Sequence, residues 1–240
     1  MLQLPYPIAH RLYILSEAAR RLNKVLTPQT KQASEQTLTA ALGPMLDVEN
    51  LKATHDHLHR LGWTAEQVFG IPLNLITLRA ATSEKVRADH ARELFARICK
   101  NDDLKLDDIE VAAAQLWPKH TQRSAALAAQ HGERLDHYHT RFAEHYWFHA
   151  LYTKQPSLTA HMSRLLLLLA AQRILLVNDP EIATKLDAGE TVDQELLDHV
   201  QVRAVSNLSR NMEHNVMLND LLSAVSNDGA YTHTQRLAFV

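Results

Sequence analysis

Two histidines near the middle of the chain have the spacing of a chemical site. His145 and His149 are four positions apart, so on a helix they share one face. Two imidazoles at this spacing can hold one metal ion, but a third ligand is needed and the glutamate of a hydrolytic zinc helix is missing. Tyr138, Phe142 and Tyr152 extend the same face. Two interpretations stay open: a ligand or metal site, and an aromatic helix face whose histidines make ordinary hydrogen bonds.

A second group of histidines lies nearer the N-terminus, at His55, His57 and His59. The pair His55-Asp56 is similar to the motif of the HD phosphohydrolases, which are all-helical and hold metal with a histidine, a His-Asp pair and a distant aspartate. The neighbouring side chains are polar, as on a solvated helix face. A metal phosphohydrolase is therefore one alternative, and a solvated surface is the other.

A third group interrupts the apolar stripe of a predicted C-terminal helix with two amides, Asn211 and Asn215. A buried amide without a hydrogen bond costs about 1–3 kcal/mol. These amides therefore indicate a helix break, a satisfied polar network, or the lining of a polar pocket to which Arg210, Glu213 and His214 contribute. The apolar positions of the stripe are Leu197, Val200, Ala204, Leu208, Leu218, Leu222 and Val225.

Other common chemistries lack their motifs in this sequence. No glycine-rich loop follows a strand, so no dinucleotide or P-loop site is predicted. No serine or cysteine nucleophile motif is present either. The single cysteine, Cys99, excludes a disulfide framework and a cysteine-based metal cluster made by this chain alone, and its position beside Ile98 predicts an inert, buried thiol.

The composition is that of a globular protein. The chain has 240 residues, of which 46% are hydrophobic, and a net charge of −2, which predicts no nucleic-acid or membrane partner. The N-terminus has no basic and apolar segments of a signal peptide. The most apolar run, Leu165 to Val177, is shorter than the roughly 20 residues that cross a bilayer. We therefore expect a soluble cytoplasmic protein with a buried apolar helix.

Helix-forming residues dominate, and no alternating strand pattern appears, so we predict an all-α fold, an irregular bundle of roughly nine to eleven helices. The polar loop at 100–106 divides the chain into a helical subdomain at 1–100 and another at 101–240, which together form one compact unit. Capping residues, Gly and Pro predict helices at about 7–26, 29–42, 47–61, 83–99, 107–117, 133–152 and 158–177, a turn opened by Thr64, and one or two helices that start at the capping box Thr191–Gln194 and end at Gly229.

Several segments also carry a family resemblance. The aromatic run Phe142–His149, the leucine-rich run Leu165–Leu176 and the polar segment Ser209–Asn215 resemble, in order and rough spacing, the flagellin lysine-N-methylases. The closing segment Asp228–Ala238 is similar to the end of these proteins, and His10–Leu15 is similar to their middle region more loosely.

The resemblance implies transfer of methyl groups from S-adenosylmethionine to lysine side chains of flagellin. Such a site holds a neutral amine in line with the sulfonium methyl, and aromatic faces stabilise the cation. The aromatic side chains available are Tyr138, Tyr146, Trp147, Phe148 and Tyr152. We assign catalysis to Glu213 and His214, and substrate or cofactor binding to Tyr138, His145, Tyr146, His149, Arg210, Asn211 and Asn215.

Two departures from the family pattern bear on this expectation. Family members are longer and carry an N-terminal cysteine-rich segment for an iron–sulfur or other metal cluster, whereas this chain has Cys99 alone. An asparagine is also expected at the position of His145. We therefore expect the chain to correspond to the C-terminal part of such an enzyme, or to a homologue that lost the cluster. In either case the cluster is confined to the absent segment, and we expect no metal site in this chain. The alternative is a non-catalytic helical module that binds flagellin or another protein.

Overall fold

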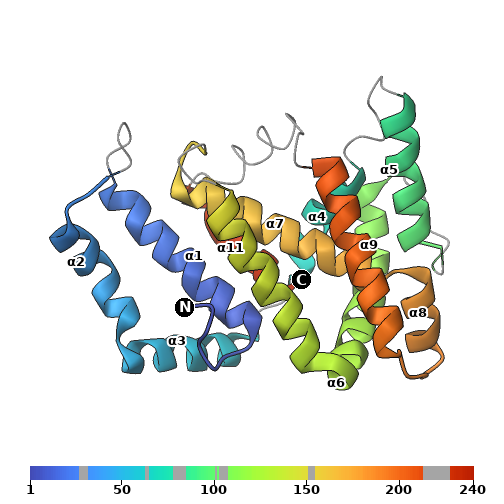
Figure 1. Cartoon of the computed structure of the whole chain (residues 1–240), viewed down its shortest axis with the longest axis horizontal. Helices are drawn as coiled ribbons and strands as arrows, with labels where there is room; N and C mark the ends of the chain where they lie inside the picture. Colours follow the sequence, from blue (N-terminus) through green and yellow to red (C-terminus); the bar gives the residue numbers. More distant parts are fainter. Residues whose placement is uncertain are drawn as a thin grey trace. The chain divides into compact units, whose positions relative to one another are not determined.

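The protein is built from helices. The structure, a computed structural model, describes residues 1–26, 32–62, 65–77, 85–100, 102, 108–150, 155–212 and 228–240. Across these ranges the backbone forms ten α-helices, two short 3-10 helices and no strand, which confirms the all-α prediction (Figure 1). The α-helices are α1 (Ile8–Val25), α2 (Glu35–Leu46), α3 (Val48–Leu61), α4 (Gly70–Thr77), α5 (Lys85–Ile98), α6 (Ile109–His149), α7 (Leu158–Val177), α8 (Pro180–Asp187), α9 (Gln194–Met212) and α11 (Asp228–Gln235), and the 3-10 helices are η1 (Glu66–Val68) and η3 (Arg236–Phe239).

Contacts between residues group the chain into two units. Helices α1 to α3 belong to the first unit, α4, α5, α8 and α9 belong to the second, and α6 and α7 supply residues to both. The loop at 100–106 lies mostly outside the described residues, so a subdomain boundary there stays a prediction. The first unit takes its residues from Met1–Ala65, Asp136–Leu166 and Leu222–Phe239, and the second from Glu66–Leu135, Leu167–Leu221 and Val240.

Local capping signals set the ends of α3. The Asp47 carboxylate accepts a hydrogen bond from the Asn50 backbone N–H at 2.9 Å, as an N-cap should. At the other end Gly62 has φ 54°, a left-handed conformation that glycine adopts without a Cβ clash. Both ends agree with the predicted helix. Apolar residues of α1, α2 and α3 then form a shared core: Ile14, Ala18, Met45 and Leu51.

Helix α1 buries polar side chains as well as its apolar stripe. The carbonyl of Ser16 accepts a hydrogen bond from the Tyr231 hydroxyl, and its Oγ accepts one from Gln235 Nε2, each at 2.9 Å. Arg11 is also buried, and its guanidinium donates to Thr140 at 3.2 Å and to Asp136. Polar positions of α1 therefore bind α6 and α11 within the first unit.

The predicted stop of α2 at Gly43-Pro44 is wrong, because the helix continues to Leu46 with Pro44 inside it. Its predicted start is wrong as well, since the helix begins at Glu35, where the Ser34 hydroxyl accepts the Thr37 N–H at 3.2 Å. Proline removes one hydrogen bond from a helix. The continued helix places Met45 in the apolar core. This packing offsets the hydrogen bond that Pro44 removes.

The predicted stop at Trp117-Pro118 is also wrong, since α6 continues through Pro118. The continuation brings His120 and Arg123 to buried partners in the second unit. The break predicted at Gly132 is confirmed within one residue, because His131 has non-helical angles of φ −137° and ψ 27°.

A buried ionic network holds the second unit together around Arg123. Its guanidinium donates five hydrogen bonds: two to Asp102 at 3.0 and 3.3 Å, two to Asp187 at 2.6 and 2.8 Å, and one to Asn178 at 3.1 Å. The amide of Asn178 also lies 3.0 Å from Nδ1 of the buried His120. Burial lowers the pKa of His120 to about 3, so this imidazole is neutral at pH 7.

Two further boundaries differ from the prediction near the C-terminus. Helix α9 starts at Gln194, and the capping side chain is Asp193, which accepts the Leu196 N–H at 2.8 Å, so the predicted Thr191 cap is wrong by two residues. Gly229 was expected to end a helix, but it lies inside α11. The stripe residues Leu197, Val200, Ala204 and Leu208 are buried as predicted.

Helix α7 contains the long apolar run seen in the sequence. Its start is confirmed at Ser157, whose hydroxyl accepts the Ala160 N–H at 3.0 Å. The helix is longer than the apolar run in the sequence. By length and composition alone it could cross a membrane. Of the apolar stretch of this helix, 94% is buried inside the structure, as is usual for a core helix. Cytoplasmic localisation stays a prediction.

Candidate functional site

The aromatic helix face predicted from the sequence lies on the part of α6 that belongs to the first unit. His145 and His149 are exposed and stack on each other, with ring centroids 4.1 Å apart and an interplanar angle of 30°. Among the described residues no group of three His, Cys, Asp or Glu side chains is placed to hold a metal ion. Their role in ligand binding stays a prediction.

Tyr146 is the predicted site residue with the most distinctive surroundings. It is buried and stacks on His161 of α7, with ring centroids 4.9 Å apart and an interplanar angle of 30°. Trp147 meets the same imidazole edge-on at 5.1 Å and 68°. The imidazole of His161 therefore contacts both a phenol and an indole, in an aromatic cluster defined by Tyr146, Trp147 and His161.

Two polar atoms of this aromatic cluster are buried without a hydrogen-bond partner among the described residues. They are the Tyr146 hydroxyl and His161 Nδ1. Burial raises the pKa of Tyr146, so the phenol is protonated at pH 7. Burial and the nearby Arg164 lower the pKa of His161 to about 4, so the imidazole is neutral. Neighbouring unpaired polar atoms of this kind are where a water or a ligand atom is expected.

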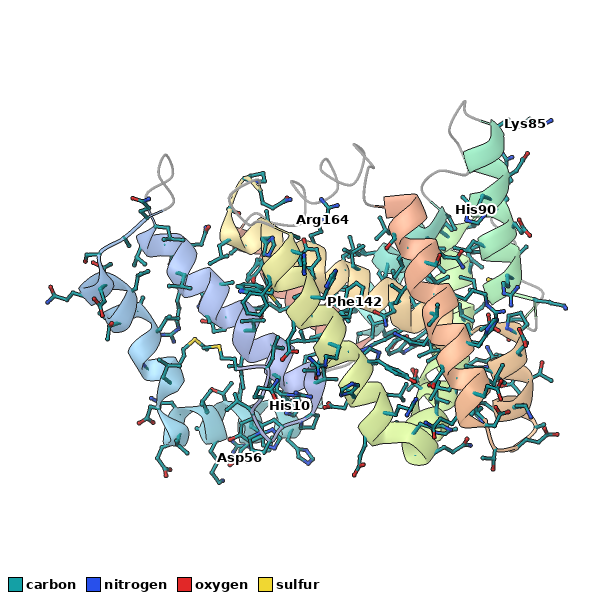
Figure 2. The ribbon with its side chains drawn as sticks, viewed as in Figure 1. His10, Asp56, Lys85, His90, Phe142 and Arg164 are labelled. Carbon is teal, nitrogen blue, oxygen red and sulfur yellow. The ribbon has the colours of Figure 1, made fainter. Side chains whose placement is uncertain are left out.

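Arg164 lies one turn beyond His161 on α7 and is labelled with Phe142 of α6 in Figure 2. Its Nε is buried without a hydrogen-bond partner in the described part of the chain. Sequence reasoning singled out neither His161 nor Arg164. The available signal was their spacing, since two polar residues three positions apart near the start of a leucine-rich helix indicate a polar face there.

The other predicted site residues fall into two classes. Tyr138 is half-buried on α6 in the first unit. Arg210 and Asn211 belong to the last turn of α9, in the second unit, and their side chains lie outside the described residues, as do Glu213, His214, Asn215 and Tyr152. Catalysis by Glu213 and His214 therefore stays a prediction.

The histidines on α3 have partners that their sequence did not suggest. Nδ1 of His55 lies 2.7 Å from Nδ1 of His10 on α1, and the ring of His55 stacks on Tyr6 with centroids 4.4 Å apart. Asp56, the partner residue of a metal phosphohydrolase motif, instead binds Lys52 at 2.6 Å. This arrangement gives a phosphohydrolase no support.

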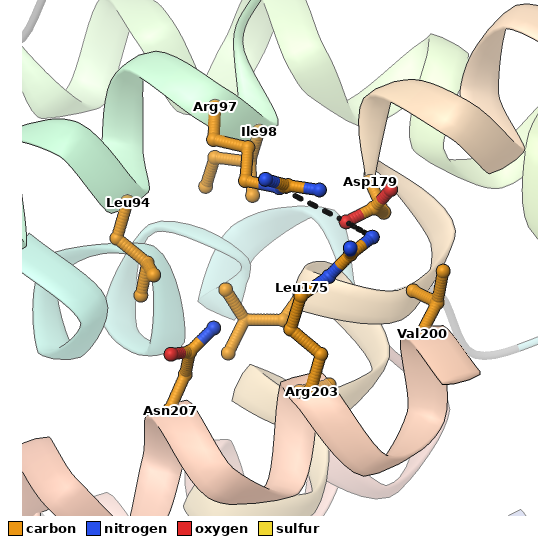
Figure 3. A pocket seen from close by; sticks show the side chains of 9 residues that line it. Leu94, Arg97, Ile98, Leu175, Asp179, Val200, Arg203 and Asn207 are labelled. Carbon is orange, nitrogen blue, oxygen red and sulfur yellow. Dashed lines mark hydrogen bonds and ion pairs between the residues drawn. The ribbon is translucent and has the colours of Figure 1, made fainter. Parts of the chain in front are cut away.

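A small cavity in the second unit lies beside two arginines and a buried carboxylate. Asp179 Oδ2 accepts Arg97 Nε at 3.1 Å and Arg203 Nη2 at 2.7 Å (Figure 3). The cavity has a volume of about 10 Å³, enough for one water. It is therefore too small for a cofactor, and these charges serve to join α5, α7, α8 and α9. The lining residues are Leu94, Arg97, Ile98, Leu175, Asp179, Val200, Arg203, Ala204 and Asn207.

Comparison with protein-family models, curated protein sequences and solved structures finds no match to this chain. The resemblance to flagellin lysine-N-methylases therefore depends only on the sequence motifs quoted for it. Among the described residues, the aromatic cluster of Tyr146, Trp147 and His161 is the arrangement most relevant to that resemblance.

Proposed function

We propose that this chain takes part in the methylation of flagellin lysines with S-adenosylmethionine as methyl donor, and that the aromatic cluster binds the cationic part of the donor. The observation that carries the proposal is a neutral imidazole, His161, in contact with the aromatic rings of both Tyr146 and Trp147. Aromatic faces attract sulfonium and methylammonium groups. An imidazole that stays neutral at pH 7 adds no positive charge to that of the nearby Arg164.

The reaction places specific demands on such a site. The lysine nitrogen must be an uncharged amine, whose lone pair attacks the methyl carbon while the bond from carbon to sulfur breaks and its electron pair stays on sulfur. The product nitrogen then loses a proton. In this proposal the unpaired Tyr146 hydroxyl and His161 Nδ1 hydrogen-bond polar atoms of the donor. Catalysis by Glu213 and His214 stays a prediction from the sequence.

Solvent access to the cluster is a further condition. His161 and Tyr146 are buried, whereas Trp147 is half-buried, so the cluster meets the surface along the indole. We expect a ligand to enter there and to displace water from the two unpaired atoms.

Calorimetry tests the donor site directly. Cation–π contacts contribute about 0.5–2 kcal/mol, so Trp147→Leu should weaken S-adenosylmethionine binding by about two- to thirtyfold. S-adenosylhomocysteine, which lacks the sulfonium charge, should bind Trp147→Leu and the unchanged protein nearly equally. Phe148→Leu is the matched control, because this neighbouring ring is 77% exposed and lies outside the cluster.

Mass spectrometry of flagellin tests the whole reaction. Unmethylated flagellin, incubated with the protein and S-adenosylmethionine, should gain mass in steps of one methyl group. A chain that neither binds S-adenosylmethionine nor adds this mass contradicts the proposal.

A second function, a non-catalytic module that binds flagellin or another protein, is favoured by a different surface. Phe148 is the most exposed aromatic side chain in the described part of α6, and it lies in sequence between His145 and His149, which are also exposed. Exposed aromatic side chains commonly anchor protein interfaces. Flagellin binding that is lost in Phe148→Ala, together with no binding of S-adenosylmethionine, would identify this function.

A further inference from the structure

The contact between His10 and His55 is a second unusual arrangement, apart from the aromatic cluster. Two ring nitrogens, Nδ1 of His10 and Nδ1 of His55, lie 2.7 Å apart, which is hydrogen-bond distance. One ring must carry a proton on Nδ1 and the other must leave its Nδ1 bare. The pair joins α1 to α3 in the first unit, and His10 and Asp56 are labelled in Figure 2.

Aromatic rings hold this pair in place. His55 stacks on Tyr6 of the N-terminal segment at 4.4 Å and 12°. His59, one turn further along α3, meets His55 at 6.4 Å, and Phe239 of η3 lies 5.9 Å from His10. The hydrogen bond therefore lies inside a group of rings, the histidine latch, made of Tyr6, His10, His55, His59 and Phe239.

We propose that the histidine latch is a pH-sensitive contact: it ties α1 to α3 at neutral pH and opens when both His10 and His55 take up a proton in mild acid. A hydrogen bond between two Nδ1 atoms survives one added proton, because a charged donor can still face a bare acceptor. It cannot survive a second, since both atoms would then be donors and both rings would carry charge.

The charges around the latch favour this response. Burial lowers the pKa of His10, and the charges of His55 and His59 lower it further. The Asp56 carboxylate, next to His55 in the sequence of α3, is bound to Lys52 at 2.6 Å, with Arg60 nearby. Tyr6 and Phe239 face the pair with neutral rings. Once His55 is charged, a proton that also charged His10 would therefore have no neighbouring anion to compensate it.

The direction of the pH effect follows from proton counting. In the unfolded chain both histidines are charged below their ordinary pKa of about 6.5, whereas the closed latch takes at most one proton. The unfolded state therefore binds more protons in mild acid, and stability falls as the pH falls. For one excluded proton, the folding equilibrium constant drops by up to about thirtyfold between pH 7.5 and pH 5.

The first experiment compares urea unfolding at pH 7.5 and pH 5, with a chelator present so that no metal bridges the rings. The buried His120 and His161 destabilise all four proteins equally on acidification. His10→Gln and His55→Gln should each lose less stability than the unchanged protein does, by up to the roughly thirtyfold change in the folding equilibrium constant that one excluded proton contributes. The matched control is His57→Gln, an exposed histidine on the same helix, which should keep the full pH dependence. Equal pH dependence in all four proteins would overturn the proposal.

The second experiment needs no variant to fold. Nuclear magnetic resonance of the imidazole nitrogens in the unchanged protein at pH 7.5 should show one ring protonated at Nδ1, with a scalar coupling to a second Nδ1 across the hydrogen bond. This coupling should disappear on acidification to pH 5. Two rings that both carry their proton on Nε2, or a coupling that persists at pH 5, would overturn the proposal.

Discussion

Removal of the Arg123 guanidinium should destabilise the protein more than any surface change on the same helix. The side chain is 1% exposed and its five N–H donors all have acceptors, on Asp102, Asp187 and Asn178. Arg123→Met leaves the Asp102 carboxylate, which is 2% exposed, with Lys119 as its remaining cationic partner. A buried carboxylate that loses its paired arginine raises the free energy of the folded state.

The size of this effect follows from the burial of the pair. Breaking a buried ion pair by removal of one partner costs about 3–5 kcal/mol, which is a large part of the roughly 5–15 kcal/mol that stabilises a typical domain. Arg123→Lys should cost at least about 2 kcal/mol, because an ammonium has three donors at one point and cannot reproduce five hydrogen bonds in a plane.

Urea unfolding followed by far-ultraviolet circular dichroism at pH 7 measures both values. Arg141→Met is the matched control on α6, since Arg141 is 71% exposed and its ion pair with Glu144 spans 3.7 Å. That substitution should change the free energy of unfolding by less than about 0.5 kcal/mol. An Arg123→Met protein within about 1 kcal/mol of the unchanged protein would show that our reading of the buried network is wrong.

Two other buried groups give simpler predictions. Gln172→Leu should stabilise the protein by about 1–3 kcal/mol, because both polar atoms of this wholly buried amide lack partners among the described residues, and a lower urea midpoint would contradict this. The Cys99 thiol should react with a thiol reagent only at the rate of unfolding, since burial raises its pKa to about 12, and fast labelling of the folded protein would refute that expectation.

Much of the helical framework follows from local signals that the sequence displays. Asp47 and Gly62 mark the ends of α3, and Ser157 marks the start of α7, because capping depends on residues within one turn. The burial of most of α7 follows from its long leucine-rich run. The sequence also predicts the inert burial of Cys99.

Other local signals are overridden by packing. Pro44 and Pro118 both read as helix ends, yet α2 and α6 continue through them. In each case the following turn carries side chains to buried partners, Met45 in the apolar core and Arg123 in the ionic network. A proline costs a helix a few kcal/mol at one position, about 3 kcal/mol in its interior, and such contacts can offset that cost.

The residues of the candidate site also separate into those that local sequence identifies and those that only packing between helices identifies. Spacing placed His145 and His149 on one helix face, because residues four apart on a helix can be read from residue order, whereas Tyr146 was named through the family resemblance. The sequence could not identify His161 as the partner of Tyr146, or His10 as the partner of His55, since each pair joins two helices. Residue order therefore determined which side chains share a helix face, whereas tertiary packing decided which faces meet, which polar atoms are left unpaired and which imidazoles stay neutral, because burial and distance between helices exist only in the folded chain.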